Sequence, residues 1–291
     1  MARPFKILSD FDGVWTNQGL EARENVRRVG EELGKLLGWD EETATTKMRW
    51  LEDKVSSAPN EWGWAPDGRR ISAYVDEDPL CLSSAMCQYI AASRDPDVAD
   101  ALDAVLGSFA SVAQFSEHCF IEAMKSYRER HPPCIVDDAR EQLQAVLDLG
   151  VEIVVISNSS ATKIGPWFRG AGIDAGEGDG HLVRLRGSAG KQTLGDTDAS
   201  ITVSGRTVRV DRPRYRAAIE EEKPDLIIGD VFSLDLALPH VMRTEGNPAA
   251  PKTLAIRRHP HTPQWVLGQQ AEGAIDVVVE RFADLVDVID R

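Results

Sequence analysis

The chain opens with a short apolar run that changes abruptly into an acidic loop. The five residues from Phe5 to Ser9 are too few for a helix and suit a buried strand. Two aspartates and a glycine follow at once in the segment 10–13, Asp-Phe-Asp-Gly, and mark where the strand opens into a loop. The pattern therefore predicts a buried strand whose end carries two carboxylates.

From Leu20 to about Arg130 the apolar residues follow the period of a helix. They recur at steps of three and four in three stripes: Val26, Val29, Leu33 and Leu36; Met48, Leu51 and Val55; Val98, Leu102, Val105 and Phe109. Asp40 is placed to cap the second of these helices. A turn-rich stretch at 56–68 interrupts the region, and we expect no regular element to persist there. The prolines at 132 and 133 end the helical region, because proline cannot continue a helix.

After this break, helical and strand-like segments alternate. In chain order we expect a helix at 139–147 ended by Gly150, a strand at 151–156, a short helix at 164–168, strands at 181–186 and 201–210, a helix at 215–222, strands at 226–228, 253–256 and 275–279, and a closing helix. The two strands at 181–186 and 201–210 are expected to pair as a hairpin. The alternation predicts a parallel sheet with helices on both faces.

The predicted fold class is therefore α/β, a Rossmann-like, doubly wound parallel sheet with a mainly α-helical domain inserted after its first strand. The α/β core comprises residues 1–17 and 133–291, and the helical insertion comprises 18–132. A chain of 291 residues is longer than one core of ordinary size needs, which agrees with two domains.

The charge of the chain limits its partners. The 33 basic and 47 acidic residues give a net charge of −14, so the protein repels polyphosphate backbones and nucleic acid is not expected as a partner. No apolar run approaches the ~18 residues that span a bilayer, and charged residues within the first ten positions do not suit a secretory signal. We expect a soluble, cytoplasmic protein with no membrane partner.

The four cysteines suggest neither a disulfide framework nor a metal site. Cys81, Cys87, Cys119 and Cys134 form no CxxC pair, and His131, three residues before Cys134, has no second pair of ligands beside it. We expect reduced cysteines that serve as small hydrophobic residues in or near a core.

Polar residues that suit catalysis follow three of the predicted strands. They are Asp10 and Asp12 after the first strand, Ser157 and Asn158 after the strand 151–156, and Asp230 and Asp235 after the strand 226–228. Reactive groups in an open parallel sheet lie in the loops at the carboxyl ends of the strands. The insertion interrupts no strand, so the three loops are expected to converge on one edge of the sheet.

These motifs resemble those of the haloacid-dehalogenase-like (HAD) superfamily. Asp-Phe-Asp-Gly-Val at 10–14 matches its first motif, DxDx(T/V), and the apolar strand ending in Ser157 matches its second. Gly-Asp-Val-Phe-Ser-Leu-Asp at 229–235 matches its fourth motif, GDxxxxD. The resemblance covers the whole predicted core and implies a HAD-type hydrolase whose helical cap domain lies between the first and second motifs.

The carboxylates suggest hydrolysis in two steps. The carboxylate of Asp10 can attack phosphorus to give an aspartyl phosphate, and Asp12 can protonate the leaving oxygen and later deprotonate water. Paired carboxylates beside a phosphate require a cation, and Mg²⁺ suits this donor set. The resemblance implies as ligands the Asp10 carboxylate, the Asp12 backbone carbonyl and Asp230, with Asp235 in support. Helix capping is the alternative role for Asp230 and Asp235.

The phosphate group needs hydrogen-bond donors and a cation of its own. Ser157 and the Asn158 amide are expected to donate to phosphate oxygens, although a turn that caps the next helix is an alternative for both. The third motif of the family supplies a lysine or arginine, and here Lys191 is the first choice and Arg212 the second. Lys163 and Lys223 are weaker candidates because they occupy positions typical of exposed helix residues.

Two further groups of residues have alternative roles. His259 and His261, after the strand 253–256, are expected either to touch the substrate or to lie in a solvated loop. Among the tryptophans, Trp39 and Trp50 suit the core of the insertion. Trp62 and Trp64 suit a mobile lid that faces the substrate.

The residues thus favour an enzyme, a Mg²⁺-dependent phosphohydrolase acting on a small phosphorylated metabolite, because a lidded cleft does not admit a polymer. A haloacid dehalogenase on the same fold would lack the second aspartate, which Asp12 supplies. A phosphonate hydrolase would need a reactive lysine in the cap, and nothing singles out Lys35, Lys47 or Lys54. A catalytically silent binding module would not need both Asp10 and Asp12. The identity of the metabolite and the oligomeric state stay open.

Overall fold

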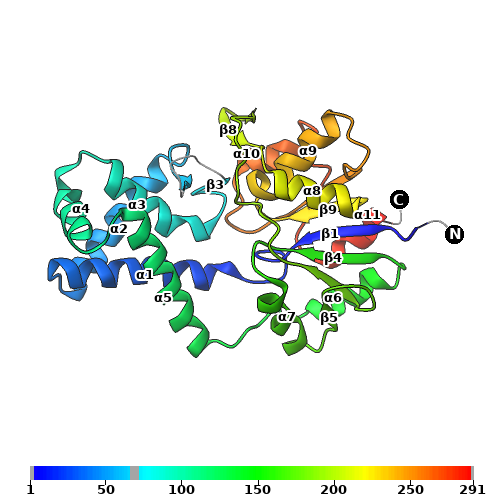
Figure 1. Ribbon diagram of the computed structural model, residues 1–291, viewed down its shortest axis with the longest axis horizontal. Helices are drawn as coiled ribbons and strands as arrows, with labels where there is room; N and C mark the ends of the chain where they lie inside the picture. The colour runs from blue at the N-terminus through cyan, green and yellow to red at the C-terminus, as the bar shows by residue number, and fades with distance from the viewer. Residues whose placement is uncertain (1–2, 66–71, 290–291) are drawn as a thin grey trace. The chain divides into compact units, whose positions relative to one another are not determined.

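The computed structural model describes residues 3–65 and 72–289 (Figure 1). The chain divides into two compact units, one made of Met1–Asn17 with Pro133–Arg291 and the other of Gln18–Pro132. The first unit is an α/β sandwich and the second is mainly helical.

A seven-stranded sheet forms the centre of the first unit, and every neighbouring pair of its strands is parallel. In spatial order its strands are β11 (Val277–Val279), β10 (Thr253–Arg257), β9 (Leu226–Gly229), β1 (Lys6–Asp10), β4 (Glu152–Ile156), β6 (Val183–Arg186) and β5 (Ala175–Gly176). The central strands are almost entirely buried, as expected for apolar runs covered on both faces. The predicted α/β, Rossmann-like fold is confirmed.

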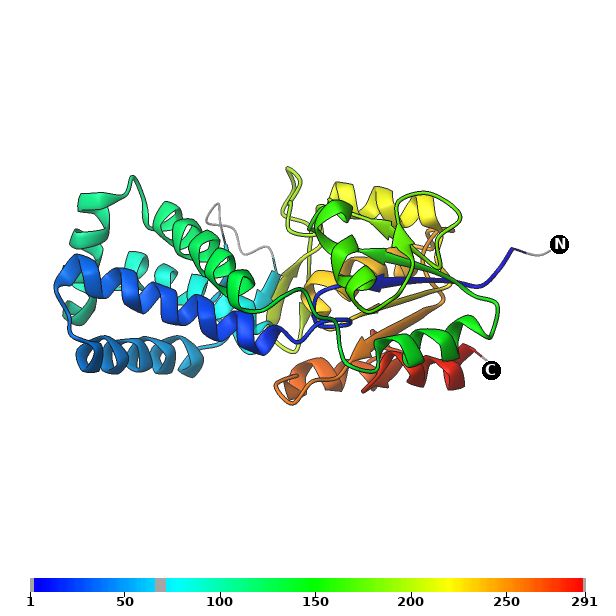
Figure 2. The ribbon, with the colours of Figure 1, turned by 90° about the horizontal axis from the view of Figure 1, so that it is seen from below.

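Helices cover both faces of this sheet, with yellow α8 on one side and red α11 on the other in Figure 2. The helices of this unit are α6 (Ala139–Leu147), α7 (Ala161–Gly170), α8 (Pro213–Glu222), α9 (Ala237–Thr244), α10 (Gln264–Leu267) and α11 (Val286–Ile289). Aromatic rings form the centre of the core on one face, where Trp15 packs against Phe168 and Phe282 with ring centroids 5.5 and 4.5 Å away. The Trp15 side chain is fixed further by its Nε1–H, which donates to Ser9 Oγ at 2.9 Å.

The register of the sheet determines where the candidate site lies. Asp10 at the end of β1 pairs with Ile156 at the end of β4, and Ser9 pairs with Ile228 of β9. The carboxyl ends of these three strands therefore reach the same edge of the sheet. The loops that follow them begin side by side.

One predicted strand pairing is wrong. The segment around β6 does not form a hairpin with 201–210 but joins the parallel sheet beside β4. The hairpin lies within the second segment, where β7 (Ser200–Val203) pairs with β8 (Arg206–Arg209). Ser204 and Gly205 make its two-residue turn with φ of 47° and 77°, the left-handed conformations that favour a tight hairpin.

Five helices form the second unit and bury their own apolar core. They are α1 (Gln18–Leu37), α2 (Glu41–Ser57), α3 (Leu82–Ala92), α4 (Pro96–Ser108) and α5 (Val112–Arg130). As predicted, Asp40 caps the second helix, and its carboxylate accepts the Thr43 N–H at 2.8 Å. Trp39 and Trp50 pack against the core, in agreement with their predicted place.

The turn-rich stretch contains more structure than predicted. The α2 helix extends to Ser57, and β2 (Gly63–Trp64) pairs with β3 (Ser72–Tyr74), while positions 66–68 lie outside the described residues. Trp62 packs on Tyr89 with ring centroids 5.4 Å apart, and Trp64 Nε1–H donates to Asp78 Oδ2 at 3.0 Å. Both rings thus have partners within their own unit, and their expected role in a lid stays a prediction.

The cysteines are free thiols, as predicted, and Cys81, Cys87 and Cys119 are buried. Cys134 is exposed, so the expectation of a core position is wrong for this residue. Because Cys134 follows two prolines, it lies in an irregular segment before α6.

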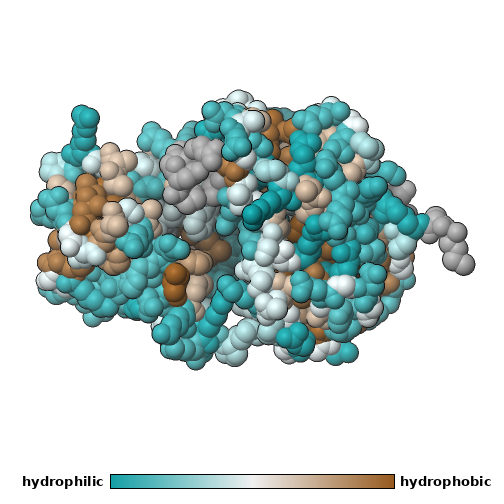
Figure 3. Space-filling model, viewed as in Figure 1, coloured by the Kyte–Doolittle hydropathy of each residue, from teal (hydrophilic) through white to brown (hydrophobic). Residues whose placement is uncertain are grey.

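Hydrophilic side chains predominate on the face drawn in Figure 3, with hydrophobic patches between them. Within residues 3–65 and 72–289, no single helix is long and apolar enough to cross a bilayer. The pair of α4 and α5, bent by 80°, meets the criteria of length and composition when the two helices are taken together.

An ion-pair network ties the strands β1, β4 and β6 to α8. Glu222, buried at the end of α8, accepts hydrogen bonds from Arg184 and Arg186 of β6 and from Lys6 of β1. Glu152 of β4 joins the same group through Arg184 and Lys6. Burial opposes the charge of Glu222, but the two guanidinium groups outweigh it and lower the pKa of this carboxyl to about 2.

The network predicts an acid-dependent stability. Glu222→Gln should lower the free energy of unfolding near pH 7 by roughly 2 kcal/mol, because two partly buried guanidinium groups lose a buried charged partner. Folding lowers the pKa of the Glu222 carboxyl, so its ionised form stabilises the folded protein at pH values above 4.5, the pKa of this group in the unfolded chain. The stabilisation is lost as the pH falls toward 2. Urea unfolding between pH 7 and pH 3 should therefore show that the difference in free energy of unfolding between the wild type and Glu222→Gln becomes smaller below pH 4.5.

Glu221→Gln is the matched control, because it removes an exposed partner of Arg186 from the same helix. It should cost less than about 0.5 kcal/mol. Equal losses in the two variants, or a difference that does not depend on pH, would contradict the assigned role of Glu222.

Candidate active site

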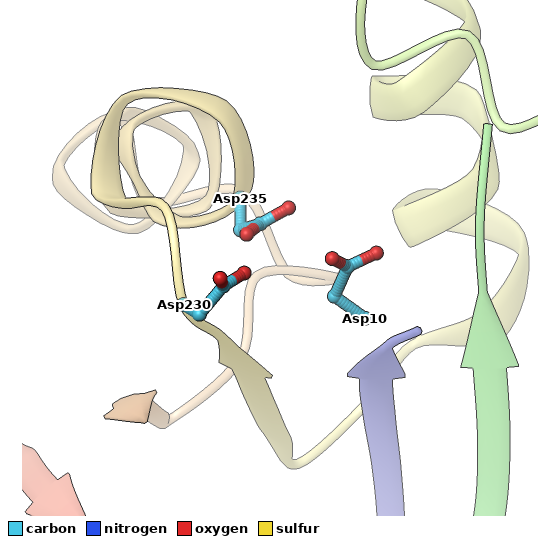
Figure 4. Close-up of side chains that lie close together, drawn as sticks. All are labelled: Asp10, Asp230 and Asp235. Atoms are coloured by element: carbon cyan, nitrogen blue, oxygen red, sulfur yellow. The ribbon is translucent and has the colours of Figure 1, made fainter. Parts of the chain in front are cut away.

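Three buried carboxylates meet at the carboxyl edge of the sheet (Figure 4). Asp10 is the last residue of β1, Asp230 follows β9, and Asp235 lies in the π-helical segment η2 (Phe232–Leu236). One oxygen from each carboxylate lies within 4.8 Å of the other two. The structure thus brings together residues from two of the predicted motifs, 220 positions apart in the chain.

Lys191 lies between two of these carboxylates. Its Nζ is 2.5 Å from Asp10 Oδ1 and 2.8 Å from Asp235 Oδ1, and its side chain is 1% exposed. Burial disfavours the charged ammonium, but Asp10 and Asp235 outweigh this and raise the pKa of Lys191. A permanently charged lysine therefore holds the cluster together, at the position of the first choice for the third-motif cation.

The ionisation of Asp10 depends on this balance. Burial, which is the largest effect, and the nearby carboxylates of Asp235 and Asp12 together raise the pKa of Asp10, although Lys191 acts in the opposite direction. Asp12 is partly exposed, and its carboxylate lies outside the group of three. Further positive charge at the site would favour the ionised form of Asp10.

The donor set suits a divalent cation. The three side chains offer hard carboxylate oxygens, which Mg²⁺ prefers, and one ammonium faces three carboxylates in this cluster. Asp10, Asp230 and Asp235 are the side chains that could hold the ion.

Gly13 is required for the close approach of Asp230. A Cβ at this position would lie 1.8 Å from Asp230 Oδ2, and the backbone has a φ of +73°. No residue with a side chain fits here without displacing the carboxylate. The glycine of the first motif therefore has a steric role at the site as well as a conformational one.

The second predicted motif is tied to the loop that carries Lys191. Ser157 is fully buried, and its Oγ accepts the Ser159 N–H at 3.1 Å. Asn158 Oδ1 accepts the backbone N–H of Lys191 at 2.8 Å. The cap of α7 is Ser160, so neither Ser157 nor Asn158 serves as the helix cap. Asn158 thus contacts the backbone of the residue whose ammonium pairs with Asp10 and Asp235.

Arg212, the second choice for the cation, packs against the segment that carries Asp235. Its Nη1 donates to the Leu234 carbonyl at 2.7 Å, and the Tyr215 hydroxyl donates to the Asp235 carbonyl at 2.9 Å. The Tyr215 ring also lies 5.4 Å from Lys191 Nζ. Sequence analysis predicted Tyr215 only as a helix residue, because nothing local indicates its contact with η2.

The histidine loop after β10 is neither simply solvated nor free to move. His259 Nε2 lies 2.9 Å from the Gly13 carbonyl oxygen and 3.8 Å from Asp230 Oδ2, and the His261 ring stacks on His259. Burial, with Arg257 and His261, lowers the pKa of His259 to about 4. The imidazole is therefore neutral at physiological pH. Lys163 and Lys223 are exposed, as expected for weaker candidates.

No family model matches the chain, and no curated protein does. Solved structures that are similar over nearly the full length of the chain include the following three. They are YfnB from Bacillus subtilis, assigned as a HAD-hydrolase and bound to magnesium (10% identity, TM-score 0.45, 100% of each chain covered), a protein from Thermotoga maritima assigned as beta-phosphoglucomutase (12%, 0.48, 98% of each chain), and CbbY from Rhodobacter sphaeroides in complex with phosphate (13%, 0.43, 97% of this chain and 96% of that one). At these identities and at TM-scores below 0.5, the activity must be inferred from the side chains of the chain itself.

The crowding at Gly13 predicts a specific loss of ion binding. Gly13→Ala should displace Asp230 and weaken Mg²⁺ binding at least about 10-fold, measured by calorimetry on the purified protein. Gly150→Ala is the matched control, because Gly150 has the same φ of +73° and a Cβ added there would meet no atom within 4 Å.

Both alanine variants should lose about 1–2 kcal/mol of stability from the left-handed backbone. Only Gly13→Ala should lose the ion. Wild-type Mg²⁺ affinity in Gly13→Ala, or an equal loss in Gly150→Ala, would contradict the steric role of Gly13.

Proposed function

We propose that this chain is a Mg²⁺-dependent phosphohydrolase of the HAD type that acts on a small phosphorylated metabolite through an aspartyl-phosphate intermediate. The observation that carries the proposal is the buried ammonium of Lys191, paired with both Asp10 and Asp235 beside Asp230 at the carboxyl edge of the sheet. The order of the motifs along the chain supports the same family.

Asp10 is the nucleophile in this proposal. The contact with Lys191 favours its carboxylate form against the effect of burial. A carboxylate oxygen of Asp10 attacks phosphorus, the bond from phosphorus to the leaving oxygen breaks, and an acyl phosphate forms on Asp10. The chemistry needs the carboxylate near phosphorus, and the end of a buried strand holds it rigidly.

Asp12 is the acid and base. It lies two residues beyond the nucleophile and is partly exposed, so it can exchange protons with substrate and water. In the first step its proton passes to the leaving oxygen, which departs as a hydroxyl group. In the second step Asp12 takes a proton from water as the water oxygen attacks phosphorus, and the bond from phosphorus to Asp10 breaks to release inorganic phosphate.

Asp10 and Asp230 would hold the divalent cation, with the Asp12 backbone carbonyl as a third ligand and Asp235 in support. When bound, the cation neutralises the carboxylates and polarises a phosphoryl oxygen. The Lys191 ammonium offsets part of the negative charge of the two carboxylates that it contacts, Asp10 and Asp235.

Ser157 and Asn158 are the proposed hydrogen-bond donors to the phosphoryl group. The Ser157 hydroxyl accepts a hydrogen bond from Ser159, which leaves its own hydrogen to donate. The Asn158 side chain accepts through Oδ1 from Lys191, which leaves its NH₂ group to donate. Both side chains thus offer donors toward the developing charge of the phosphoryl oxygens.

We further propose that the helical unit, residues 18–132, is the cap that selects the substrate. An enzyme with a separate cap is better suited to a small metabolite than to a polymer as its substrate. A dehalogenase is less well supported, because displacement of a halide needs neither Asp12 nor the acidic pair Asp230 and Asp235.

The proposal predicts hydrolysis of an aryl phosphate that requires added Mg²⁺. Asp10→Asn should lower the rate by roughly 10³-fold or more, since the amide cannot form the phosphoryl enzyme. Asp198→Asn is the control, because Asp198 is an exposed aspartate whose partner is Arg209 of the hairpin. Steady-state kinetics with and without excess chelator measure both effects.

Hydrolysis that persists in excess chelator would show that the reaction does not require a divalent cation, and would contradict that part of the proposal. Hydrolysis that persists in Asp10→Asn would contradict the assignment of Asp10 as the nucleophile. A panel of phosphorylated metabolites tested with the wild type would then identify the substrate class.

A further inference from the structure

The end of β10 and the loop after it contact the turn that follows the nucleophile. Arg257 Nη1 donates to the Gly13 carbonyl at 3.0 Å and also to the Val14 carbonyl. His259 Nε2 lies 2.9 Å from the same Gly13 oxygen and must carry a hydrogen there, because a carbonyl only accepts. One carbonyl oxygen thus receives donors from two side chains more than 240 positions away in the chain.

Gly13 is the residue of this turn whose backbone conformation most needs to be restricted by contacts with other groups. Glycine has more backbone freedom than any other residue, and a Cβ is excluded here by Asp230. Its N–H donates to Thr16 Oγ1 at 3.2 Å, and its carbonyl accepts from Arg257 and His259. The peptide planes on both sides of the Gly13 Cα are therefore held in place.

The held planes determine the direction of the Asp12 carbonyl. A peptide group is planar and trans, so the Asp12 C=O points opposite to the Gly13 N–H of the same plane. The plane can rotate only about the bonds of Gly13 and Asp12. Contacts that fix the Gly13–Val14 plane remove much of the freedom of its neighbour.

The same residues also face Asp230. His259 Nε2 is 3.8 Å from Asp230 Oδ2, and the half-buried Arg257 guanidinium interacts electrostatically with this carboxylate. Arg257 and His259 therefore contact the turn at Gly13, which belongs to the first motif, and lie near Asp230 of the fourth motif.

We propose that Arg257 and His259 are positioning residues for the divalent cation: they orient the Asp12–Gly13 turn relative to Asp230. The inference rests on the proposed function, in which Asp12 and Asp230 supply ligands. Neither side chain touches the ion or the substrate in this proposal, and both act through Gly13. The effect is on ion affinity rather than on the chemical step.

The chain offers matched controls for both residues. Arg258, the next residue after Arg257, is exposed and faces Glu280 at 3.9 Å. His181 is also exposed, and its Nδ1 lies 2.9 Å from Asp174 Oδ1. An effect of general charge or of loop composition would appear in these controls as well.

The experiment compares Arg257→Met and His259→Ala with Arg258→Met and His181→Ala in the full-length protein. Calorimetry with MgCl₂ alone measures ion affinity, and steady-state kinetics measure the KM for Mg²⁺, the KM for an aryl phosphate and kcat at saturating Mg²⁺. The first pair should bind Mg²⁺ about 10- to 100-fold more weakly, with kcat at saturating Mg²⁺ and the KM for the aryl phosphate within about 3-fold of wild type. The controls should match the wild type in every measurement.

His259→Gln tests whether the hydrogen bond itself matters. The glutamine amide can place an N–H near the position of Nε2, so this variant should recover most of the affinity lost in His259→Ala. If Arg257→Met does not fold, as judged by its melting temperature, the histidine variants decide the question.

Wild-type Mg²⁺ affinity in His259→Ala or in a folded Arg257→Met overturns the positioning role and leaves the proposed function intact. Equal losses in the controls also overturn it. A wild-type enzyme that hydrolyses without Mg²⁺, or that does not bind the ion, overturns the proposed function and this inference together.

Discussion

The contact between one buried ammonium and two buried carboxylates is the interaction on which the rest of the site depends. Asp10 ends β1 and Asp235 lies in η2, and the two carboxylates would repel each other in a water-poor environment. Lys191 allows both to lie there, and with Asp230 they leave negative charge that suits a divalent cation and a phosphoryl group. The electrostatics thus connect three separate segments of chain into one candidate catalytic centre. Removing the ammonium would leave carboxylates that must either take up protons or move apart.

The backbone meets this electrostatic requirement through close approaches that only small residues allow. Gly13 leaves room for Asp230, and a Cβ at Gly229 would lie 2.4 Å from the Cβ of Asp235. Arg212 and Tyr215 hold the carbonyls of η2 that face α8. Short π-helical segments often occur at functional sites, and here the segment turns Asp235 back so that its Oδ2 accepts the Val231 N–H. The site is therefore surrounded by groups whose role is to fix the backbone around the carboxylates.

Much of this arrangement is predictable from the sequence, and the part that is not has a physical reason. The strand ends at Asp10 and Ile156 follow from short apolar runs, and topology alone then places their loops on one edge. The pairing of β6 was mispredicted because a strand of only four residues, Val-Arg-Leu-Arg, does not specify its neighbour. Its parallel position beside β4 depends on the whole sheet. Lys191 could be proposed but not distinguished from Arg212, since the choice depends on loop geometry set by Asn158. The contacts of Arg257, His259 and Tyr215 join segments far apart in the chain, and local patterns carry no signal for such pairs.

A crystal structure of the wild-type protein grown with Mg²⁺ and beryllofluoride, a mimic of a bound phosphoryl group, tests the central claim most directly. The account predicts beryllium joined to a carboxylate oxygen of Asp10, the ion in contact with Asp10 and Asp230, and the Lys191 ammonium still within hydrogen-bond distance of Asp10. Beryllofluoride attached elsewhere, or an ion bound away from these carboxylates, would contradict it.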